Sequence, residues 1–402
     1  MKILLYAIDF TPSIGGIQTI TEVLAAGLAV WNGGSNGNRG ENNQVTVVTQ
    51  TPAGKIDDSQ FSFRVVRRPG TAQLFGLVRD TDIFHIVGPA IIPMAMGLLL
   101  GKPVAVQHDG YMAICPIGNY LHQPGGTLCP GHFQKGNYLE CYSCQSVEMS
   151  RTRSVRNLLL MMPRRWLLKR VAANIGASDH TGRRVALPRT QTIYHGIEDP
   201  LSQGAAPAPP LPLGESPIQF AYLGRLVTEK GVDVLLQAAA KLNREGTDFR
   251  LKIIGDGPDR QRLESVAREL GVGHGVNFIG YRSGESLSAA LADVSVNIMP
   301  SRCEEACPLT AIEQMMRGQL MIAADLGGLG EVVGDTGLKF APGDSDGLAE
   351  CIRQVIDQPS LIQTLGEAGR RRALDIFSKE EMMQQHLALY GQVVHTNGAV
   401  RD

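Results

Sequence analysis

Short apolar runs rich in β-branched residues alternate with segments of helical periodicity along almost the whole chain. In the first half the apolar runs fall at 3–8, 45–49, 83–87, 104–107, 174–177 and 192–194. In the second half they fall at 219–223, 250–254, 276–279, 294–299 and 320–323. Strands separated by helices form βαβ units, so this alternation predicts an α/β protein with parallel sheets.

The length of the chain and one change of composition predict two domains. A chain of 402 residues is long enough for about two domains, each with its own core. Residues 199–217 are rich in Pro, Ala and Gly, which is typical of an extended, semi-rigid linker. We therefore expect an N-terminal Rossmann-like domain at 1–200, a linker at 201–217 and a C-terminal Rossmann-like domain at 218–377.

The ends of these domains suggest how they hold a ligand. In open α/β sheets, ligands bind beyond the carboxyl ends of the strands, so two doubly wound domains facing across a cleft can enclose one site.

Ser378 and Glu381 have the spacing of a capping box, which predicts a helix at the start of the terminal segment 378–402.

Composition excludes several classes of protein. The net charge of −1 gives no global attraction to nucleic acid. No apolar run approaches the roughly 18 residues needed to span a bilayer. The run at 3–8 is short and is followed by Asp9, so we interpret it as a strand rather than a signal peptide. Seven cysteines without a secretory signal favour a reducing cytoplasm.

The segment 301–313 places one carboxylate before a helix and another inside it. Pro308 suits the first helical position, and the helix should open at the carboxyl end of the strand 294–299. The amides of Leu309 and Thr310 and the helix dipole would favour an anion there. Glu305 and Glu313 can accept hydrogen bonds from hydroxyls. A phosphate together with a polyol describes a nucleotide sugar.

With its flanking residues 299–301 and 327–331, this segment resembles the retaining GT-B glycosyltransferases of glycosyltransferase family 4, the group 1 glycosyltransferases. The resemblance covers nearly the whole chain and is densest at 220–333. It implies that Glu305 holds donor-sugar hydroxyls and that Glu313 holds the ribose. Cys307 and Pro308 stand where the family more often has an aromatic residue and a glycine.

Two cations and several glycines are candidate phosphate contacts. Arg225 and Lys230 lie in 222–231, which matches the family's diphosphate-binding signature; solvated surface charge is the alternative. Gly255 follows another strand and resembles a glycine turn of the family. Gly15 and Gly16 follow the first strand and could bring backbone amides close to a phosphate, although a simple tight turn has the same pattern.

His108 is the candidate for the catalytic centre. It ends the strand at 104–107 and matches the family histidine that projects toward the donor sugar; a buried structural histidine is the alternative. Asp109 could orient His108 or cap a turn, and His195 could be a hinge contact or a polar cap. No carboxylate is marked as a covalent nucleophile. The resemblance therefore implies front-face displacement, and without an Asp-x-Asp motif we expect catalysis to need no metal cofactor.

The polar segment 111–146 has no clear periodicity, which is unusual in a compact domain unless something staples it. Cys115, Cys129, Cys141 and Cys144 could hold a structural Zn²⁺, with His122 or His132 as substitute ligands. Thiols without metal, or an iron–sulfur centre, are the alternatives.

The segment 151–170 combines seven Arg and Lys residues with apolar ones and contains no acidic residue. This pattern is typical of contact with an anionic membrane surface, which would place the protein peripherally on the inner face of the membrane. The alternative is a helix that packs on the core with a solvated basic rim. Pro163 argues against one continuous helix.

We therefore expect a retaining hexosyltransferase that moves a hexose from a nucleotide diphosphate sugar, UDP favoured over GDP, to a saccharide or lipid-linked hydroxyl. One alternative is a sugar phosphorylase or nucleotide-sugar hydrolase of the same fold. Another is a non-catalytic, zinc-stapled module that binds a nucleotide sugar.

Overall fold

The computed structural model describes residues 1–31, 43–123, 125–205, 207–209, 217–247 and 249–399, which form two compact units. Unit 1 comprises Met1–Tyr120, Pro130–Ile197 and Phe377–Asp402, and unit 2 comprises Leu121–Cys129 and Glu198–Ile376. Of the expected linker at 201–217, residues 206 and 210–216 lie outside the described residues.

Unit 1 is built on a seven-stranded sheet in the order β3-β2-β1-β4-β5-β8-β9, with every neighbouring pair parallel. Its central strands are buried because their residues are almost all apolar, as expected when helices cover both faces. The strands are β1 (Lys2–Ala7), β2 (Gln44–Thr49), β3 (Arg64–Arg67), β4 (Ile83–Val87), β5 (Val104–His108), β8 (Ala173–Gly176) and β9 (Thr190–Thr192).

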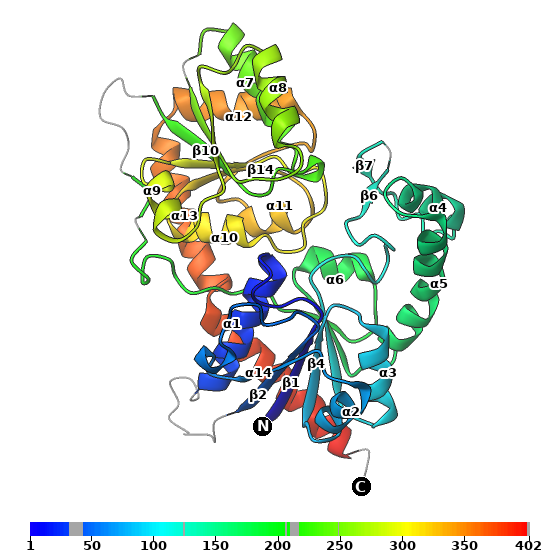
Figure 1. The fold of residues 1–402 in the computed structure, drawn as a ribbon. Coiled ribbons are helices and arrows are strands. Elements are labelled where there is room, and N and C mark those ends of the chain that lie inside the picture. The colour runs from blue at the N-terminus through cyan, green and yellow to red at the C-terminus, as the bar shows by residue number, and fades with distance from the viewer. Residues whose placement is uncertain (32–42, 124, 206, 210–216, 248, 400–402) are drawn as a thin grey trace. The chain divides into compact units, whose positions relative to one another are not determined.

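Among the described residues, seven α-helices accompany this sheet (Figure 1). Among them α14 follows unit 2 in the chain but packs against α1, where a Cβ on Gly27 would lie only 2.5 Å from the sulfur of Met383. The helices are α1 (Gly16–Val30), α2 (Thr71–Arg79), α3 (Ile91–Leu99), α4 (Tyr138–Ser146), α5 (Arg151–Leu168), α6 (Asp179–Val185) and α14 (Lys379–Ala399).

Unit 2 has a six-stranded parallel sheet in the order β12-β11-β10-β13-β14-β15, the strand order of a Rossmann fold. Its strands are β10 (Gln219–Leu223), β11 (Arg250–Ile254), β12 (Val276–Gly280), β13 (Val296–Met299), β14 (Leu320–Ala324) and β15 (Leu338–Phe340). Its helices are α7 (Val232–Arg244), α8 (Arg260–Glu269), α9 (Gly284–Leu291), α10 (Leu309–Met316), α11 (Gly327–Val333), α12 (Ser345–Asp357) and α13 (Ser360–Ile376).

The core of unit 2 joins the sheet to α7 and α12. Phe220 and Ile253 on the strands pack with Leu235 on α7 and Ile352 on α12, and all four are fully buried. The apolar stripe of α7 recurs at helical spacing and therefore faces the sheet along its whole length.

The predicted fold class, two doubly wound Rossmann-like sheets, is confirmed. Local differences remain. The run expected at 192–194 pairs instead as Thr190–Thr192, and the short edge strands β3 and β15 were not predicted because each has only three or four residues. In the part of the chain that the structure describes, no helix has the length and apolar character needed to cross a bilayer.

Two polar regions are more regular than the sequence suggested. Segment 111–146 contains the hairpin β6 (Leu121–His122) to β7 (Thr127–Leu128) and the helix α4, so the expectation of a structureless loop was wrong. Helix α5 continues through Pro163, which contradicts the expected interruption. A proline removes one helical hydrogen bond, and the flanking turns of α5 hold the helix across that gap.

Candidate active site

The centre of the unit 2 sheet is where its strand order reverses. Strands β10 and β13 are neighbours in the sheet, although β11 and β12 lie between them in the sequence. The loops that leave the carboxyl ends of such neighbours diverge to opposite faces and leave a binding crevice between them. Lys230 follows β10 and Glu305 follows β13, so the topology brings both predicted residues to this edge.

Lys230, Ser301 and Glu305 form a largely buried constellation. The Nζ of Lys230 donates to Oε2 of Glu305 at 2.8 Å, and the hydroxyl of Ser301 donates to Oε1. The side chains of Lys230 and Glu305 are only 20% and 11% exposed. Each carboxylate oxygen therefore has its own donor, and the orientation of Glu305 is fixed before any ligand arrives.

Both members of this pair are held in their charged forms. Burial is the largest influence and would lower the pKa of Lys230, but the charge and hydrogen bond of Glu305 and the neighbouring Cys303 together outweigh it, and the pKa is raised. Burial would likewise raise the pKa of Glu305, but the charge and hydrogen bond of Lys230, with the hydrogen bond of Ser301, lower it. The site thus combines a cation and an anion at neutral pH.

Three further contacts tie the segment after β10 to the loop after β13. Gly231 has φ of 67°, and a Cβ there would lie 2.0 Å from the carbonyl oxygen of Pro300. Arg302 donates from Nη2 to Asp233 at 2.7 Å and from its amide to the carbonyl of Glu229 at 2.8 Å. The sequence analysis missed Asp233 and Arg302, because nothing in their spacing reveals that positions 69 apart form a pair.

Arg225 lies at the same edge but faces solvent. Its side chain is exposed and makes no hydrogen bond or ion pair with any residue that the structure describes. Its backbone is fixed, since the hydroxyl of Tyr222 donates to the carbonyl oxygen of Arg225 at 2.7 Å. The guanidinium is therefore available to an anion without breaking an existing contact.

Gly255 is required by packing. Its φ is 145°, and a Cβ would lie 1.8 Å from the carbonyl oxygen of Gly224, so the two turns can meet only at a glycine. A nucleotide contact at Gly255 remains a prediction.

Helix α10 begins one residue later than predicted. Pro308 is its N-cap, with φ of −74° and ψ of 107°, and Leu309 is the first helical residue. The amides of Leu309 and Thr310 are among the first four N–H groups, which have no acceptor within an α-helix. The end of α10 therefore has the donors that an anion requires.

Glu313, on the next turn of α10, contrasts with Glu305. It is half-buried, and its side chain makes no hydrogen bond within the described part of the chain. Burial raises the pKa of Glu313, and the charge of Arg317 opposes this only in part. The structure therefore gives the two glutamates opposite electrostatic environments on one short segment.

In unit 1, Gly15 and Gly16 lie where β1 gives way to α1. Gly15 is the N-cap of α1, and no side chain caps this end of the helix. The adjoining Ile14 is 82% exposed. The amide end of α1 is therefore uncovered within unit 1, as the phosphate or acceptor prediction requires.

His108 is buried at the end of β5. Its Nε2 lies 3.0 Å from Oδ1 of Asn174, whose own amide donates to the carbonyls of Leu168 and Pro188. Nε2 must therefore carry the proton, and within the described part of the chain the buried Nδ1 has no hydrogen-bond partner. Burial lowers the pKa of His108, so the ring is neutral. Its catalytic role remains a prediction.

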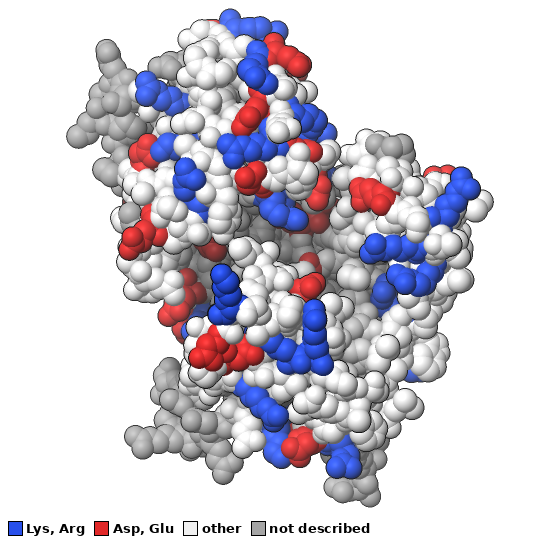
Figure 2. Space-filling view, viewed as in Figure 1, with Lys and Arg blue, Asp and Glu red and all other residues white. Residues whose placement is uncertain are grey.

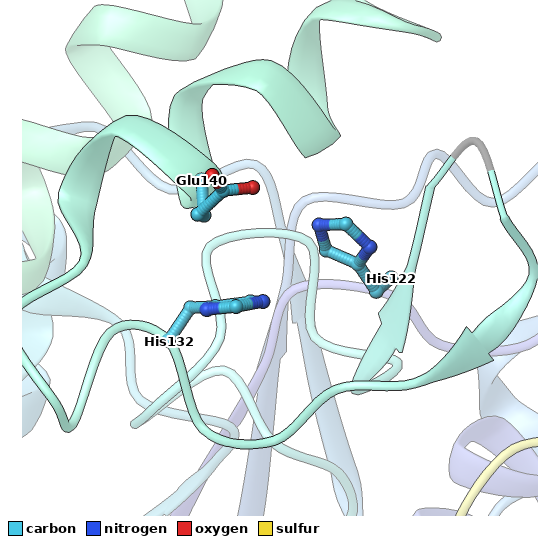
Figure 3. A group of neighbouring side chains, drawn as sticks. All are labelled: His122, His132 and Glu140. Carbon is cyan, nitrogen blue, oxygen red and sulfur yellow. The ribbon is translucent and has the colours of Figure 1, made fainter.

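The structure also locates the metal-ligand candidates of segment 111–146. Cys115, Cys141 and Cys144 are buried thiols, and Cys129 is half-buried. Within the described ranges, the group of three potential ligand atoms lying within 4.8 Å of one another is instead His122, His132 and Glu140 (Figure 3). The two histidines that we considered as substitutes are thus grouped with a carboxylate that the sequence analysis did not consider.

Comparison with known proteins shows what parts of this chain are similar to. Residues 208–372 match the family model "Glycosyl transferases group 1". The 2-deoxystreptamine glucosyltransferase of Streptomyces kanamyceticus is 29% identical over 261 residues, which are 61% of this chain and 67% of that protein. The glycogen synthase of Mycobacterium tuberculosis is 34% identical over 163 residues, 40% of this chain but only 39% of that protein.

Solved structures extend the likeness of fold to nearly the whole chain. Sucrose-phosphate synthase from Thermosynechococcus elongatus aligns over 98% of this chain and 99% of its own, with a TM-score of 0.68 and 20% identity. Anabaena Alr3699/HepE aligns over 98% and 100%, with a TM-score of 0.69 and 18% identity. Residues 208–372 thus match the group 1 glycosyltransferases, and nearly the whole chain has the GT-B fold.

Proposed function

We propose that this protein transfers a hexose from a UDP-sugar to an acceptor hydroxyl, with retention of configuration at the anomeric carbon. The observation that carries the proposal is the buried Lys230–Glu305 pair held by Ser301. Around it lie the exposed guanidinium of Arg225 and the amide end of α10. These groups match the two parts of such a donor, a diphosphate and a sugar.

The charges assign a role to each residue. Lys230 uses one N–H on Glu305 and keeps two more for a phosphate oxygen, while Arg225 offers a planar fork of donors. Both cations would stabilise the negative charge that develops on the leaving diphosphate. Glu305 would accept hydrogen bonds from sugar hydroxyls, and Glu313 from the ribose.

Retention would follow from front-face displacement. The acceptor hydroxyl attacks the anomeric carbon from the side on which the diphosphate departs, and a phosphate oxygen takes its proton. The protein then contributes positioning and charge stabilisation, without a covalent intermediate or a catalytic metal. His108 would act on the donor sugar from unit 1.

The preference for uridine and for a hexose rests on the relatives. Alr3699/HepE of Anabaena is described in complex with UDP-glucose, and the Streptomyces kanamyceticus relative is named a glucosyltransferase.

The experiment is a donor and acceptor screen. UDP-, GDP- and ADP-hexoses are first ranked by the rise in melting temperature, because a ligand of the native state stabilises it. NMR of the product then follows the anomeric configuration. An inverted product would refute retention, and acceptor-independent release of free sugar would identify a hydrolase.

We also propose that unit 1 contacts an anionic lipid surface through α5. Apolar side chains project from this helix: Leu159, Met162 and Trp166 are 69%, 50% and 55% exposed. The guanidinium of Arg170 stacks 3.6 Å above the ring of Trp166. Figure 2 shows Lys and Arg gathered over the region of α4 and α5. Apolar groups between cations suit insertion at a negatively charged interface.

Not every cation of the helix serves this surface. Arg164 and Arg165 donate to the carbonyls of Met112 and Ala113 and hold α5 on the preceding segment. The surface proposed for lipid therefore consists of Arg151, Arg156, Leu159, Met162 and Trp166.

Sedimentation with vesicles tests this surface. We expect binding to vesicles of phosphatidylglycerol but not of phosphatidylcholine, and loss of binding in Trp166→Glu. Tyr281→Glu is the matched control, because Tyr281 is 53% exposed but lies in unit 2. Equal binding by both variants would refute the assignment to α5.

We further propose a structural Zn²⁺ in segment 111–146. Two ligand sets are considered: the four cysteines that the sequence suggests, and His122, His132 and Glu140, whose ligand atoms lie within 4.8 Å of one another. Both consist of ligands that zinc accepts. Elemental analysis should give about one zinc per chain. Replacing zinc with Co²⁺ separates the sets, because only thiolates give sulfur-to-cobalt charge-transfer absorption. Protein that purifies folded and without metal would refute the proposal.

A further inference from the structure

A chain of buried hydrogen bonds runs through unit 1 from α14 to the end of β5. The hydroxyl of Tyr390 lies 2.6 Å from Nδ1 of His85, and Nε2 of His85 lies 3.1 Å from Oε1 of Gln107. The Nε2 of Gln107 donates to Oδ1 of Asp109 at 2.6 Å. Tyr390, His85 and Gln107 are each at most 3% exposed, so the chain is shielded from solvent.

The carboxylate at its end fixes the direction of every bond. An ionised Asp109 can only accept, so Gln107 must turn its NH₂ toward Asp109 and its carbonyl toward His85. Nε2 of His85 must then carry a proton, which leaves Nδ1 as an acceptor for the hydroxyl of Tyr390. All three donors point toward Asp109.

The charge states agree with this direction. Burial lowers the pKa of His85 to about 3, so the ring is neutral and has one acceptor nitrogen. Burial would raise the pKa of Asp109, but the hydrogen bond and charge of His195 and the hydrogen bond of Gln107 lower it. His195 donates from Nε2 to the same oxygen, Oδ1, at 2.8 Å.

Asp109 is therefore satisfied on one oxygen only. Oδ1 accepts from both Gln107 and His195, whereas Oδ2 is buried and has no hydrogen-bond partner among the residues that the structure describes. The side chain is only 4% exposed. An ionised oxygen buried without a donor costs free energy, and a hydroxyl supplied by a ligand would recover it.

The position of Asp109 identifies that ligand. It lies at the carboxyl end of a central parallel strand, directly after His108, where ligands of α/β sheets bind. We propose that Asp109 is a substrate-binding carboxylate of unit 1, whose Oδ2 accepts a hydrogen bond from a hydroxyl of the polyol acceptor. We propose with it that Tyr390, His85 and Gln107 are positioning residues that keep Asp109 ionised and its Oδ1 occupied. This inference rests on the proposed glycosyl transfer.

The groups around Asp109 come from five parts of the chain. His85 on β4 and His386 on α14 are both neutral, since burial lowers the pKa of His386 to about 4. His195 donates from the segment after β9, and His108 precedes Asp109 on β5. Arg165 on α5 adds a positive charge near His108. None of these groups replaces the donor that Gln107 provides.

Three variants test the contribution of each group in this chain of hydrogen bonds. Asp109→Asn should lower kcat/KM by about 10² to 10³, the scale for one preorganised polar group. Gln107→Leu removes one of the two donors to Oδ1, so the pKa of Asp109 should rise and the acid limb of the pH profile should move to higher pH. Tyr390→Phe should move this limb in the same direction by less, with kcat on the plateau within twofold of the wild type.

The matched control is Tyr6→Phe. Tyr6 is a buried tyrosine on the neighbouring strand β1 and takes no part in the chain of bonds, so its pH profile should equal the wild type. The proposal is overturned by an unchanged acid limb in Gln107→Leu, or by a Tyr390→Phe profile identical to that of Tyr6→Phe.

A measurement without substrate separates this inference from the proposed function. In ¹⁵N-histidine-labelled protein near neutral pH, His85 should appear as the Nε2–H tautomer. Finding the Nδ1–H tautomer or a charged ring would overturn the chain of bonds, whatever the activity. If the wild type transfers no sugar from any nucleotide donor, the proposed function fails. The tautomer of His85 still shows whether the hydrogen bonds from Tyr390 to Asp109 exist.

Discussion

At the residue scale, the Lys230–Glu305 pair should serve both the proposed catalysis and the stability of the fold. If Lys230 stabilises the leaving diphosphate as proposed, replacing it with Ala should lower kcat by roughly two to three orders of magnitude. It also leaves Glu305 buried without its cation, which should lower the free energy of unfolding by about 3–5 kcal/mol. Steady-state kinetics and urea denaturation measure the two effects.

Lys241→Ala is the control for this variant. Lys241 pairs with Asp346 at 2.7 Å, but Asp346 is 78% exposed, so the pair lies in water. Exposed pairs contribute at most about 1 kcal/mol. Equal loss of stability in the two variants would contradict the assignment of a buried, functional pair.

Glu313 should show the opposite relation between stability and function. Because burial raises its pKa, the folded protein binds a proton more tightly than the unfolded chain, and Glu313 destabilises the fold above that pKa. Glu313→Gln should therefore raise the melting temperature at pH 7, with a smaller gain in acid, and weaken binding of the nucleotide.

Thermal denaturation across pH and calorimetric titration with UDP measure these two outcomes. Glu269→Gln, an exposed helical glutamate of α8, serves as the comparison. A lower melting temperature for Glu313→Gln at pH 7 would contradict this prediction, because it would mean that ionised Glu313 stabilises the fold.

At the element scale, the junction of the 3-10 turn η2 (Thr228–Lys230) with α7 depends on one glycine. Gly231→Ala adds a Cβ 2.0 Å from the carbonyl oxygen of Pro300 and keeps a positive φ. The loop that carries Lys230 must then move, so both stability and kcat/KM should fall, by more than tenfold for the latter because a misplacement of about 1 Å can cost 10²-fold.

Gly271→Ala separates strain from displacement. Gly271 has φ of 69°, nearly that of Gly231, but a Cβ there meets nothing within 4 Å. It should cost only the roughly 1–2 kcal/mol of a left-handed residue and leave kcat/KM unchanged. Similar kinetics for the two alanine variants would contradict the close approach at Pro300.

The elements also show how far sequence reasoning reaches. The central strands and the helix bearing Glu313 were predicted because apolar periodicity and a proline followed by a buried stripe are local signals. The edge strands β3 and β15 were missed, since three or four residues give little pattern. Arg302 and Asp233, and the bonds from Tyr390 to Asp109, depend on contacts between distant positions, which no local pattern encodes.

At the scale of the whole molecule, buried histidines should make unit 1 sensitive to acid. The pKa of His85 is lowered to about 3 and that of His386 to about 4, both mainly by burial, whereas an unfolded histidine titrates near 6.5. The unfolded chain therefore binds more protons, so the stability that these rings contribute is present above pH 6.5 and is lost as the pH falls toward about 4.

Calorimetry between pH 7.5 and 4 measures this slope. His386→Leu should flatten it, because one buried titrating ring is removed. His395→Leu, an exposed histidine of the same helix α14, should not. Identical slopes for both variants would refute the role of the buried ring.

The division of the chain has a consequence for biosynthesis. Unit 1 is completed by residues 377–402, which leave the ribosome only after the whole of 198–376 has been made. Unit 2 can therefore acquire its structure while the nascent chain still lacks α14, and His85 has no contact with Tyr390 until that helix has been made. During that interval the uncovered side of the first sheet is the surface that a chaperone would recognise.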